Sequence, residues 1–165
     1  HYIDKKVDKS LLDEMLSAAN LAPSWKNSQT PRFYVATGEK SKNAVREALP
    51  EFNRKNSENA SAYIVTTVVL NRSGFDKDGT AVTEIGNGWG YYDLGLNNMA
   101  LLLKATELGI STLVMGIRDG QKLREEFDIP ETEAVVSVIA VGYTDSEIVR
   151  PKRKSVEDFA KFYED

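Results

Sequence analysis

An apolar segment at residues 90–108 constrains the fold more than any other feature of the sequence. If the segment is helical, its apolar positions fall on nearly all sides: Leu94, Leu96, Met99, Ala100, Leu101, Leu102, Leu103, Ala105 and Leu108. A helix that is hydrophobic all round is normally buried, either in a core or in an oligomer interface. Gly109 follows at once and is a residue type that commonly ends helices. The segment therefore predicts one long buried helix, against which the rest of the chain must pack.

The other segments predict shorter helices and strands in alternation. Apolar residues recur at helical spacing after Ser10, an expected N-cap, up to Asn20. Further helices are expected at residues 41–49 and 121–127, and one more is led by Ser155 and ends near Tyr163. Strands are expected at residues 32–37, 62–70, 111–115 and 134–141, of which 62–70 is a continuous β-branched run that predicts burial on both faces. Strands separated by helices indicate an α/β or α+β layered domain, and we expect α+β.

Length and composition predict one domain spanning residues 1–165. The chain is 41% hydrophobic and 28% charged, which is typical of a folded globular domain. The net charge of −4 argues against general nucleic-acid binding, which needs a clustered excess of Lys and Arg. Neither a membrane-spanning run nor a signal-peptide pattern is visible, so we expect a cytoplasmic protein, although the sequence begins at His1 rather than at a Met.

The supply of reactive side chains is narrow, because the chain has no cysteine and its single histidine is His1. This excludes disulfides, thiolate nucleophiles and Cys/His zinc sites, and leaves no internal histidine for a Ser-His-Asp triad. We therefore predict no metal site and no catalytic side chain. If the protein is an enzyme, a bound cofactor is expected to supply the reactive centre.

Glycines cluster at residues 86–90, directly before the long helix. A dinucleotide-binding fingerprint needs G-x-G-x-x-G directly after a strand, whereas here Tyr91 occupies the third glycine position and a loop precedes the cluster. We interpret the cluster as a structural turn that begins the helix.

The segment at residues 22–31 concentrates the hydroxyl of Ser24 and the carboxamides of Asn27 and Gln29 in one loop rich in turn formers. Carboxamides both donate and accept hydrogen bonds, so they suit the mixed edge of a flavin pyrimidine ring. A loop capped by its own side chains would use the same residue types. On chemistry alone both interpretations stay open.

Motifs in a fixed order along nearly the whole chain resemble the nitroreductase family. They are Ala22-Pro23-Ser24-x-x-Asn27-Ser28-Gln29, a strand from Arg32-Phe33, the helix from Tyr92-Asp93-Leu94-Gly95 to Leu108-Gly109, Leu113-Val114-Met115-Gly116 and Val141-Gly142-Tyr143. The resemblance implies an α+β fold in which helices wrap a central mixed β-sheet. It also implies a homodimer with FMN at the subunit interface and the long helix in that interface, although burial in a monomer core stays an alternative for the helix.

The resemblance also implies the residues that bind FMN. Pro23, Ser24, Asn27 and Gln29 would lie along the isoalloxazine and ribityl, and Asn53 matches an asparagine that contacts the ring. Backbone groups of Met115 and Gly116 would lie near flavin N5, where a glycine suits close approach. The phosphate would be held from the basic run at residues 150–154, first by Arg153 and second by Lys152.

Two departures from the family pattern concern the same site. The family continues Gln-Pro-Trp, whereas this chain has Gln29-Thr30-Pro31, which shifts the proline and removes the aromatic residue. The family also carries an Arg-x-Ser phosphate-binding stretch just upstream of the position of His1, and the sequence does not contain it. Either the given sequence lacks a segment that carries this stretch, or flavin binding is weaker and depends on the C-terminal basic run.

The implied activity is hydride transfer from NADH or NADPH to FMN and then to a small acceptor such as a nitroaromatic, quinone or enone, in a ping-pong cycle. Two alternatives stay open. One is a flavoenzyme of the same fold with another reaction, such as dehalogenation or flavin fragmentation, which a distinctive lid sequence at residues 71–88 would mark. The other is a non-catalytic flavin-binding module.

Overall fold

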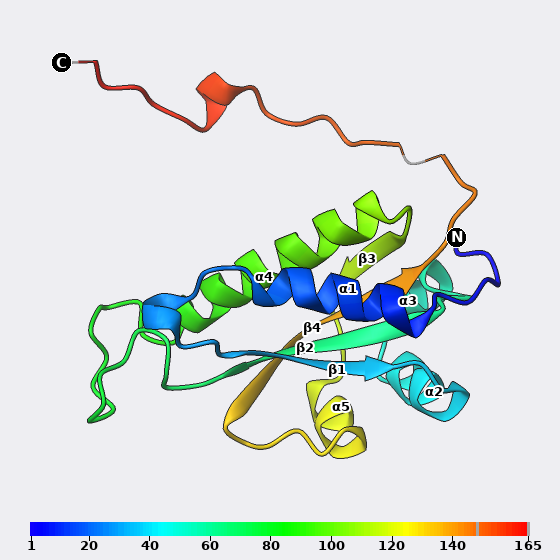
Figure 1. The fold of residues 1–165 in the computed structure, drawn as a ribbon, viewed down its shortest axis with the longest axis horizontal. Coiled ribbons are helices and arrows are strands. Elements are labelled where there is room, and N and C mark those ends of the chain that lie inside the picture. Colours follow the sequence, from blue (N-terminus) through cyan, green and yellow to red (C-terminus); the bar gives the residue numbers. More distant parts are fainter. Residues whose placement is uncertain (148, 165) are drawn as a thin grey trace.

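A four-stranded antiparallel sheet forms the centre of the molecule in a computed structural model that describes residues 1–147 and 149–164 (Figure 1). The strands are β1 (Pro31–Ala36), β2 (Ala62–Val69), β3 (Ser111–Met115) and β4 (Glu133–Gly142), in the order β1-β2-β4-β3. Each neighbouring pair is antiparallel. The expectation of a mixed sheet is therefore wrong for the described residues, while the α+β class and all the expected strands are confirmed.

The antiparallel order follows from the connections between the strands. Helices α2 (Glu39–Glu47) and α3 (Glu51–Asn56) follow β1, and the chain then returns beside β1 as β2. Figure 1 shows both helices at one end of the sheet, so they form an excursion at that end and not a crossover to a parallel strand. Helix α3 was not among the helices expected from the sequence.

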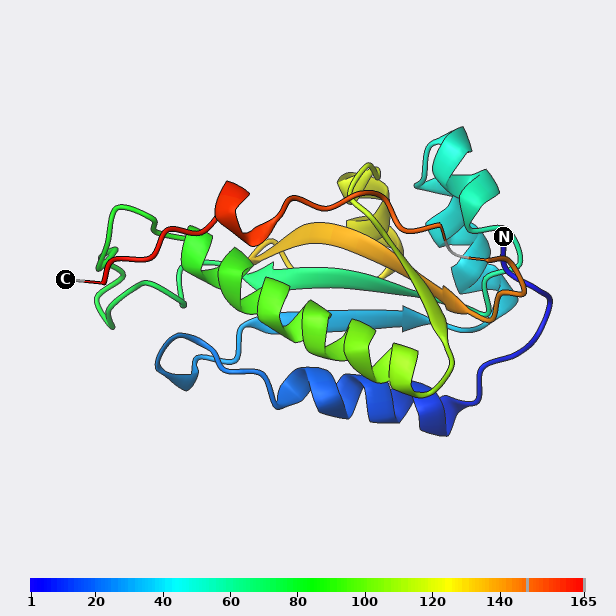
Figure 2. The same cartoon turned by 90° about the horizontal axis from the view of Figure 1, so that it is seen from above.

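Helices cover both faces of the sheet and enclose two apolar cores (Figures 1 and 2). Helices α1 (Lys9–Asn20) and α4 (Gly88–Glu107) pack on one face, where Met15, Ile64 and Leu101 are fully buried. Helices α2 and α5 (Gly120–Glu126) pack on the other face around Val45, Val65 and Val138. The N-cap of α1 is Asp8 and not Ser10, which lies inside the helix.

Strand β2 lies between β1 and β4 and is buried on both faces, as its β-branched run predicted. The register shifts between Thr66 and Thr67, and the hydroxyl of Thr67 donates to the buried carboxylate of Glu133 at 2.5 Å. Tyr34 on β1 donates to the same carboxylate at 2.9 Å. Burial, together with this hydrogen bond, raises the pKa of Tyr34 to about 12. Glu133 thus joins three strands of the sheet.

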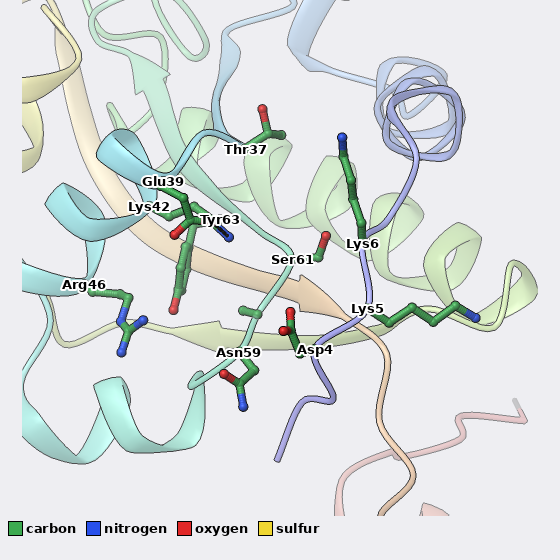
Figure 3. A pocket seen from close by; sticks show the side chains of 11 residues that line it. Asp4, Lys5, Lys6, Thr37, Glu39, Lys42, Arg46, Asn59, Ser61 and Tyr63 are labelled. Atoms are coloured by element: carbon green, nitrogen blue, oxygen red, sulfur yellow. Dashed lines mark ion pairs between the residues drawn. The ribbon is translucent and has the colours of Figure 1, made fainter.

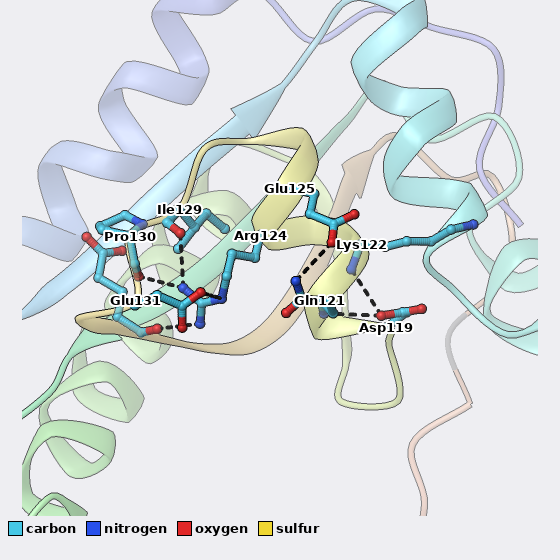
Figure 4. A network of polar contacts seen from close by, with 9 residues as sticks. Asp119, Gln121, Lys122, Arg124, Glu125, Ile129, Pro130 and Glu131 are labelled. Atoms are coloured by element: carbon cyan, nitrogen blue, oxygen red, sulfur yellow. Dashed lines mark hydrogen bonds and ion pairs between the residues drawn. The ribbon is translucent and has the colours of Figure 1, made fainter.

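Helix α5 and the turn after it are held by two polar side chains (Figure 4). Asp119 caps the helix by accepting from the backbone N–H groups of Gln121 and Lys122. The guanidinium of Arg124 donates to the carbonyls of Ile129, Pro130 and Glu133. A fork of donors suits such a cluster of carbonyls, and it fixes the chain before β4.

Helix α4 begins at Gly88, so the glycine cluster is the turn that starts the helix, as predicted. A Cβ on Gly90 would lie 2.9 Å from the side chain of Val68, so the glycine permits close packing of α4 on β2. Only part of the helix surface is covered. The opposite side exposes four large apolar side chains, among them Tyr92 at 60% and Leu103 at 58%, together with Tyr91 and Met99. Burial in a monomer core therefore accounts for only one side of this helix.

The chain leaves the body after Tyr143, which forms an isolated bridge with Ile3. The following residues, 144–147 and 149–164, are called the C-terminal arm below; those from 145 on are exposed, apart from the half-buried Ala160. Figure 1 shows the arm running back along the molecule on the α4 side of the sheet. The helix expected from Ser155 to Tyr163 is wrong: Ser155 does form a capping box, but it leads only a 3-10 turn at Val156–Asp158. A short helix without a packing partner is only marginally stable, which is the situation of this segment.

Among the described residues, none of the helices combines the length and apolar character that a membrane crossing requires.

Candidate functional site

The loop at residues 22–30 connects α1 to β1 and has an unusual backbone. A 3-10 turn at Trp25–Asn27 occupies its middle. Lys26, Asn27 and Gln29 have positive φ angles of 46°, 55° and 49°. Residues with a side chain rarely adopt this left-handed region, and such residues are most frequent at functional sites. The backbone identifies the 22–30 loop as a candidate site without reference to its sequence motif.

Local hydrogen bonds fix the end of the loop. The Ser24 hydroxyl accepts from the backbone N–H of Gln29 at 3.0 Å, and the Arg32 guanidinium donates to the carbonyl of Gln29 at 2.7 Å. Among the described residues, the hydrogen bonds of the loop leave the carboxamides of Asn27 and Gln29 free, and both residues are exposed. The loop therefore combines the two interpretations that the sequence left open: it is capped by its own Ser24, and it still presents two free carboxamides.

A small cavity of about 190 Å³ lies beside this loop. Ser24 and Gln29 line it together with Arg32 and with Asn97 from α4. Pro23 and Asn27 belong to the same loop but do not line the cavity. Arg32 and Asn97 were not predicted as site residues, because neither belongs to a recognisable motif.

Aromatic side chains pack the middle of the loop onto α4. The ring centroids of Trp25 and Trp89 are 4.7 Å apart, and those of Trp89 and Tyr92 are 5.8 Å apart. Such tilted and edge-on pairs are favourable contacts between aromatic rings. The indole nitrogen of Trp25 is buried and has no hydrogen-bond partner within the described part of the chain.

Asn53 and the residues after β3 form a second group of predicted site residues. Asn53 is 4% exposed, and its amide donates to the carbonyl of Ile117 at 3.0 Å. The side chain of Met115 is buried in the core, so only its backbone is available to a ligand. A Cβ on Gly116 would meet no atom within 4 Å, so nothing within one chain requires a glycine there. Asn53 thus fixes the segment that contains Met115 and Gly116.

The two groups do not come together in one chain. The 22–30 loop leads into β1, whereas Met115 ends β3 at the opposite edge of the sheet. Helix α3, which carries Asn53, also lies at the other end of the molecule from the 22–30 loop in both views (Figures 1 and 2). Lys152 and Arg153 form a third group on the exposed C-terminal arm.

A separate cavity of about 480 Å³ opens near the N-terminal segment, between α2 and the start of β2 (Figure 3). Its lining carries both signs of charge, with Lys6, Lys42 and Arg46 opposed by Asp4 and Glu39. Lys42 already pairs with Glu39 at 2.7 Å, and Figure 3 shows the side chains of Lys5 and Lys6 diverging. None of the predicted site residues lines this cavity, so it is distinct from the candidate site.

The part of the chain that the structure describes contains no group of three or more His, Cys, Asp or Glu residues placed to hold a metal ion. The cavity beside the 22–30 loop presents hydroxyl, carboxamide and guanidinium groups.

Comparison with known proteins is consistent in fold and in sequence. A nitroreductase family protein from Streptococcus pneumoniae TIGR4 has the same fold, with a TM-score of 0.84 and 22% identity over 99% of this chain and 94% of that one. An FMN-dependent nitroreductase from Clostridium difficile R20291 is 26% identical, with a TM-score of 0.70, over 96% of this chain and 87% of that one.

A protein of Archaeoglobus fulgidus named "Putative NADH dehydrogenase/NAD(P)H nitroreductase" is 27% identical over 153 residues, in an alignment that covers 88% of this chain and 79% of that protein. The model of the nitroreductase family matches residues 1–143. That match spans the sheet, the helices on both faces and the 22–30 loop. The chain therefore belongs to the nitroreductase family.

Proposed function

We propose that this protein is an FMN-dependent oxidoreductase that uses NADH or NADPH to reduce a small organic acceptor, such as a nitroaromatic, a quinone or an enone. The observation that carries the proposal is the 22–30 loop, with its left-handed backbone and its free, exposed carboxamides at Asn27 and Gln29. FMN and NAD(P)H appear in the names of the relatives from C. difficile and A. fulgidus.

The donor set of the loop fits a flavin. The pyrimidine edge of an isoalloxazine presents carbonyl acceptors beside an N–H donor, and a carboxamide can match both without a charge. The exposed side chains of Asn27 and Gln29 can reach such an edge, while Pro23 and Ser24 would lie along the ring and ribityl. A Cβ added at Gly116 would meet no atom within 4 Å, so a ring has space to approach the backbone there.

FMN, when bound, supplies hydride transfer in two half-reactions, first from NAD(P)H and then to the acceptor. The residues of the chain bind and orient. The 22–30 loop holds the ring edge, Asn53 fixes the Met115–Gly116 backbone through Ile117, and Arg153, with Lys152 second, holds the phosphate. No side chain of the chain is assigned a proton-transfer role.

We further propose that the functional unit is a homodimer. Two features support it: the exposed apolar side of α4, with Tyr91, Tyr92, Met99 and Leu103, and the exposed arm. A second copy would cover both, and large exposed apolar patches commonly mark such interfaces. A two-fold arrangement would also allow the 22–30 loop of one copy to meet the Asn53 and Gly116 group of the other. Each flavin site would then need both copies.

The whole chain would form one flavin-binding domain, and we propose a cytoplasmic location, where NADH and NADPH are available as reductants.

The test is flavin binding followed by reduction. Titration of the apoprotein with FMN should quench flavin fluorescence to saturation, and NADH or NADPH should then bleach the bound flavin without oxygen. Addition of a quinone should restore the yellow colour. Protein that takes up no FMN would rule out the proposal. Bound FMN that neither nucleotide reduces would instead identify a flavin-binding module, and reoxidation only by a halogenated acceptor would indicate a different reaction.

A further inference from the structure

Helix α4 carries one acidic residue in its buried surface, Asp93, which is 2% exposed. Its carboxylate accepts from the backbone N–H of Trp25 at 3.1 and 3.2 Å, through both oxygens. It also accepts from the hydroxyl of Ser73 at 2.5 Å. A buried carboxylate is retained only where donors compensate its lost hydration, and here the donors come from the 22–30 loop and from the turn after β2.

Ser73 extends the reach of Asp93 to the far end of the loop. Its oxygen lies 2.5 Å from the hydroxyl of Ser28 and 3.2 Å from that of Thr30. Because a carboxylate can only accept, Ser73 gives its single proton to Asp93. Ser28 and Thr30 must then donate to the Ser73 oxygen, which gives this network one consistent direction. One carboxylate thereby holds the loop at Trp25, directly, and at Ser28 and Thr30, through Ser73.

The residues between these attachment points are the strained ones. Lys26, Asn27 and Gln29, with positive φ angles, lie between Trp25 and Thr30. Left-handed backbone at residues with side chains persists only when surrounding contacts enforce it. The carboxylate network supplies such contacts on both sides of these residues.

The turn that supplies Ser73 is itself tightly packed. Gly74 follows Ser73 with a φ of +83°, and a Cβ there would lie 2.6 Å from the indole of Trp89. Trp89 in turn packs on Trp25. The turn, the helix and the loop therefore share one rigid contact region centred on Asp93.

We propose that Asp93 is a positioning residue, whose carboxylate holds the 22–30 loop in the conformation that presents Asn27 and Gln29 to the flavin. The inference rests on the proposed function for its flavin part, but the hold on the loop is a separate and separately measurable claim. It predicts that loss of the charge releases the loop while the sheet and both cores stay folded.

The chain provides its own probe, because its two tryptophans are Trp25 and Trp89. Tryptophan fluorescence of the apoprotein therefore reports on the contact between the loop and α4. The tryptophan bands of near-ultraviolet circular dichroism, which lie at longer wavelength than those of the tyrosines, report on the same contact. The variants are Asp93→Asn, which removes the charge at nearly constant volume, and Ser73→Ala, which keeps the bond to Trp25 and cuts the links to Ser28 and Thr30.

Glu133→Gln is the matched control. Glu133 is also a buried carboxylate, and it also accepts from two donors, Tyr34 and Thr67, but it joins strands and does not contact the loop. Each variant is measured for unfolding by urea, for the tryptophan spectra and for FMN titration. The control reports what a comparable loss of stability does by itself.

For Asp93→Asn we expect altered tryptophan spectra, an FMN dissociation constant raised about tenfold or more, and cooperative unfolding. Ser73→Ala should give a smaller change of both readouts, and Glu133→Gln should change neither. Unchanged spectra in Asp93→Asn would overturn the inference, as would an equal loss of FMN affinity in Glu133→Gln. If the wild type binds no FMN, the proposed function and the flavin part of the inference both fail, and the spectra still decide whether Asp93 holds the loop.

Discussion

The 22–30 loop and the C-terminal arm both carry residues that we propose to contact FMN, yet they are held in opposite ways. The loop is attached at Trp25, Ser28 and Thr30 to a buried network, and its Trp25 ring packs on Trp89 of α4. In the arm, Phe162 is 77% and Tyr163 is 83% exposed. The conformation of the loop is thus determined within one chain, whereas the described residues hold the arm only through local hydrogen bonds, such as the Ser155 capping box, and through Thr144 at its start.

The loop and the arm therefore differ in the conformational freedom that each would lose when FMN binds. A loop that is already fixed loses little freedom on binding, so its contacts should contribute to affinity in full. An exposed arm loses much freedom unless another surface orders it first. On the proposed dimer that surface is the second copy, and the phosphate contacts of Lys152 and Arg153 become available only after assembly.

Removal of the arm should produce the largest effect. In a chain that ends at Asp145, the large apolar side chains of the arm can no longer be buried on a second copy, and burial of each contributes roughly 1.5–3 kcal/mol. We expect both dimerisation and FMN affinity to fall by more than about 100-fold, which is a loss of more than about 2.7 kcal/mol. Sedimentation velocity and FMN titration measure the two quantities.

Thermal unfolding of the truncated apoprotein tests whether the rest of the domain stays folded without the arm. The arm contributes nothing to the two apolar cores, so the cooperative transition should persist. A truncated protein that remains dimeric and binds FMN normally would show that the arm is dispensable, and the contrast with the loop would then have no functional meaning.

The sequence predicted much of the fold because most of its patterns are local. The β-branched run of β2 and the apolar surface of α4 indicate burial by themselves. Helix α3 was not predicted because it is short and polar. It is stabilised by tertiary contacts, such as the hydrogen bond from Asn53 to Ile117, far along the chain. The prediction of a helix after Ser155 was wrong for the opposite reason. The local capping box is present, but the segment lacks the tertiary packing that would stabilise a helix.

The candidate site also combines residues that a local pattern predicts with contacts that form only in the folded chain. Ser24, Asn27 and Gln29 lie close together in sequence and were predicted through a local motif. Asp93 was visible as one acid within an apolar helix, but its partners Trp25 and Ser73 lie 68 and 20 residues away. No spacing rule connects such positions, because the contact exists only after α4 has packed beside the loop.

Arg153→Ala should produce an intermediate effect that is specific to the arm. Loss of one charge-assisted hydrogen bond to a phosphate costs roughly 1.5–3 kcal/mol, so the FMN dissociation constant should rise about 10- to 100-fold. Unfolding should not change, because the residue is exposed. Lys152→Ala should have a smaller effect, and riboflavin, which lacks the phosphate, should bind all three proteins equally.

Arg150→Ala is the matched control, since it removes the same charge from the same basic run. If both arginine variants weaken FMN binding equally, and high salt abolishes the difference from wild type, the run acts only as a diffuse positive charge. If neither variant changes the titration, the run is simply solvated and the arm does not hold the phosphate.

Lys26→Gly should produce the smallest effect, and it tests whether the loop is held by its attachments or by its own side chains. Glycine adopts the positive φ of Lys26 without strain, which gains roughly 1–2 kcal/mol, but it loses roughly 0.5–1 kcal/mol through the freer unfolded chain. The exposed pair of Lys26 with Asp76, at 3.4 Å, contributes at most about 1 kcal/mol. These contributions nearly cancel, so the free energy of unfolding should change by less than about 1 kcal/mol in urea titrations followed by tryptophan fluorescence. A loss of more than about 2 kcal/mol would mean that the Lys26 side chain, and not the network around Asp93, determines the loop conformation.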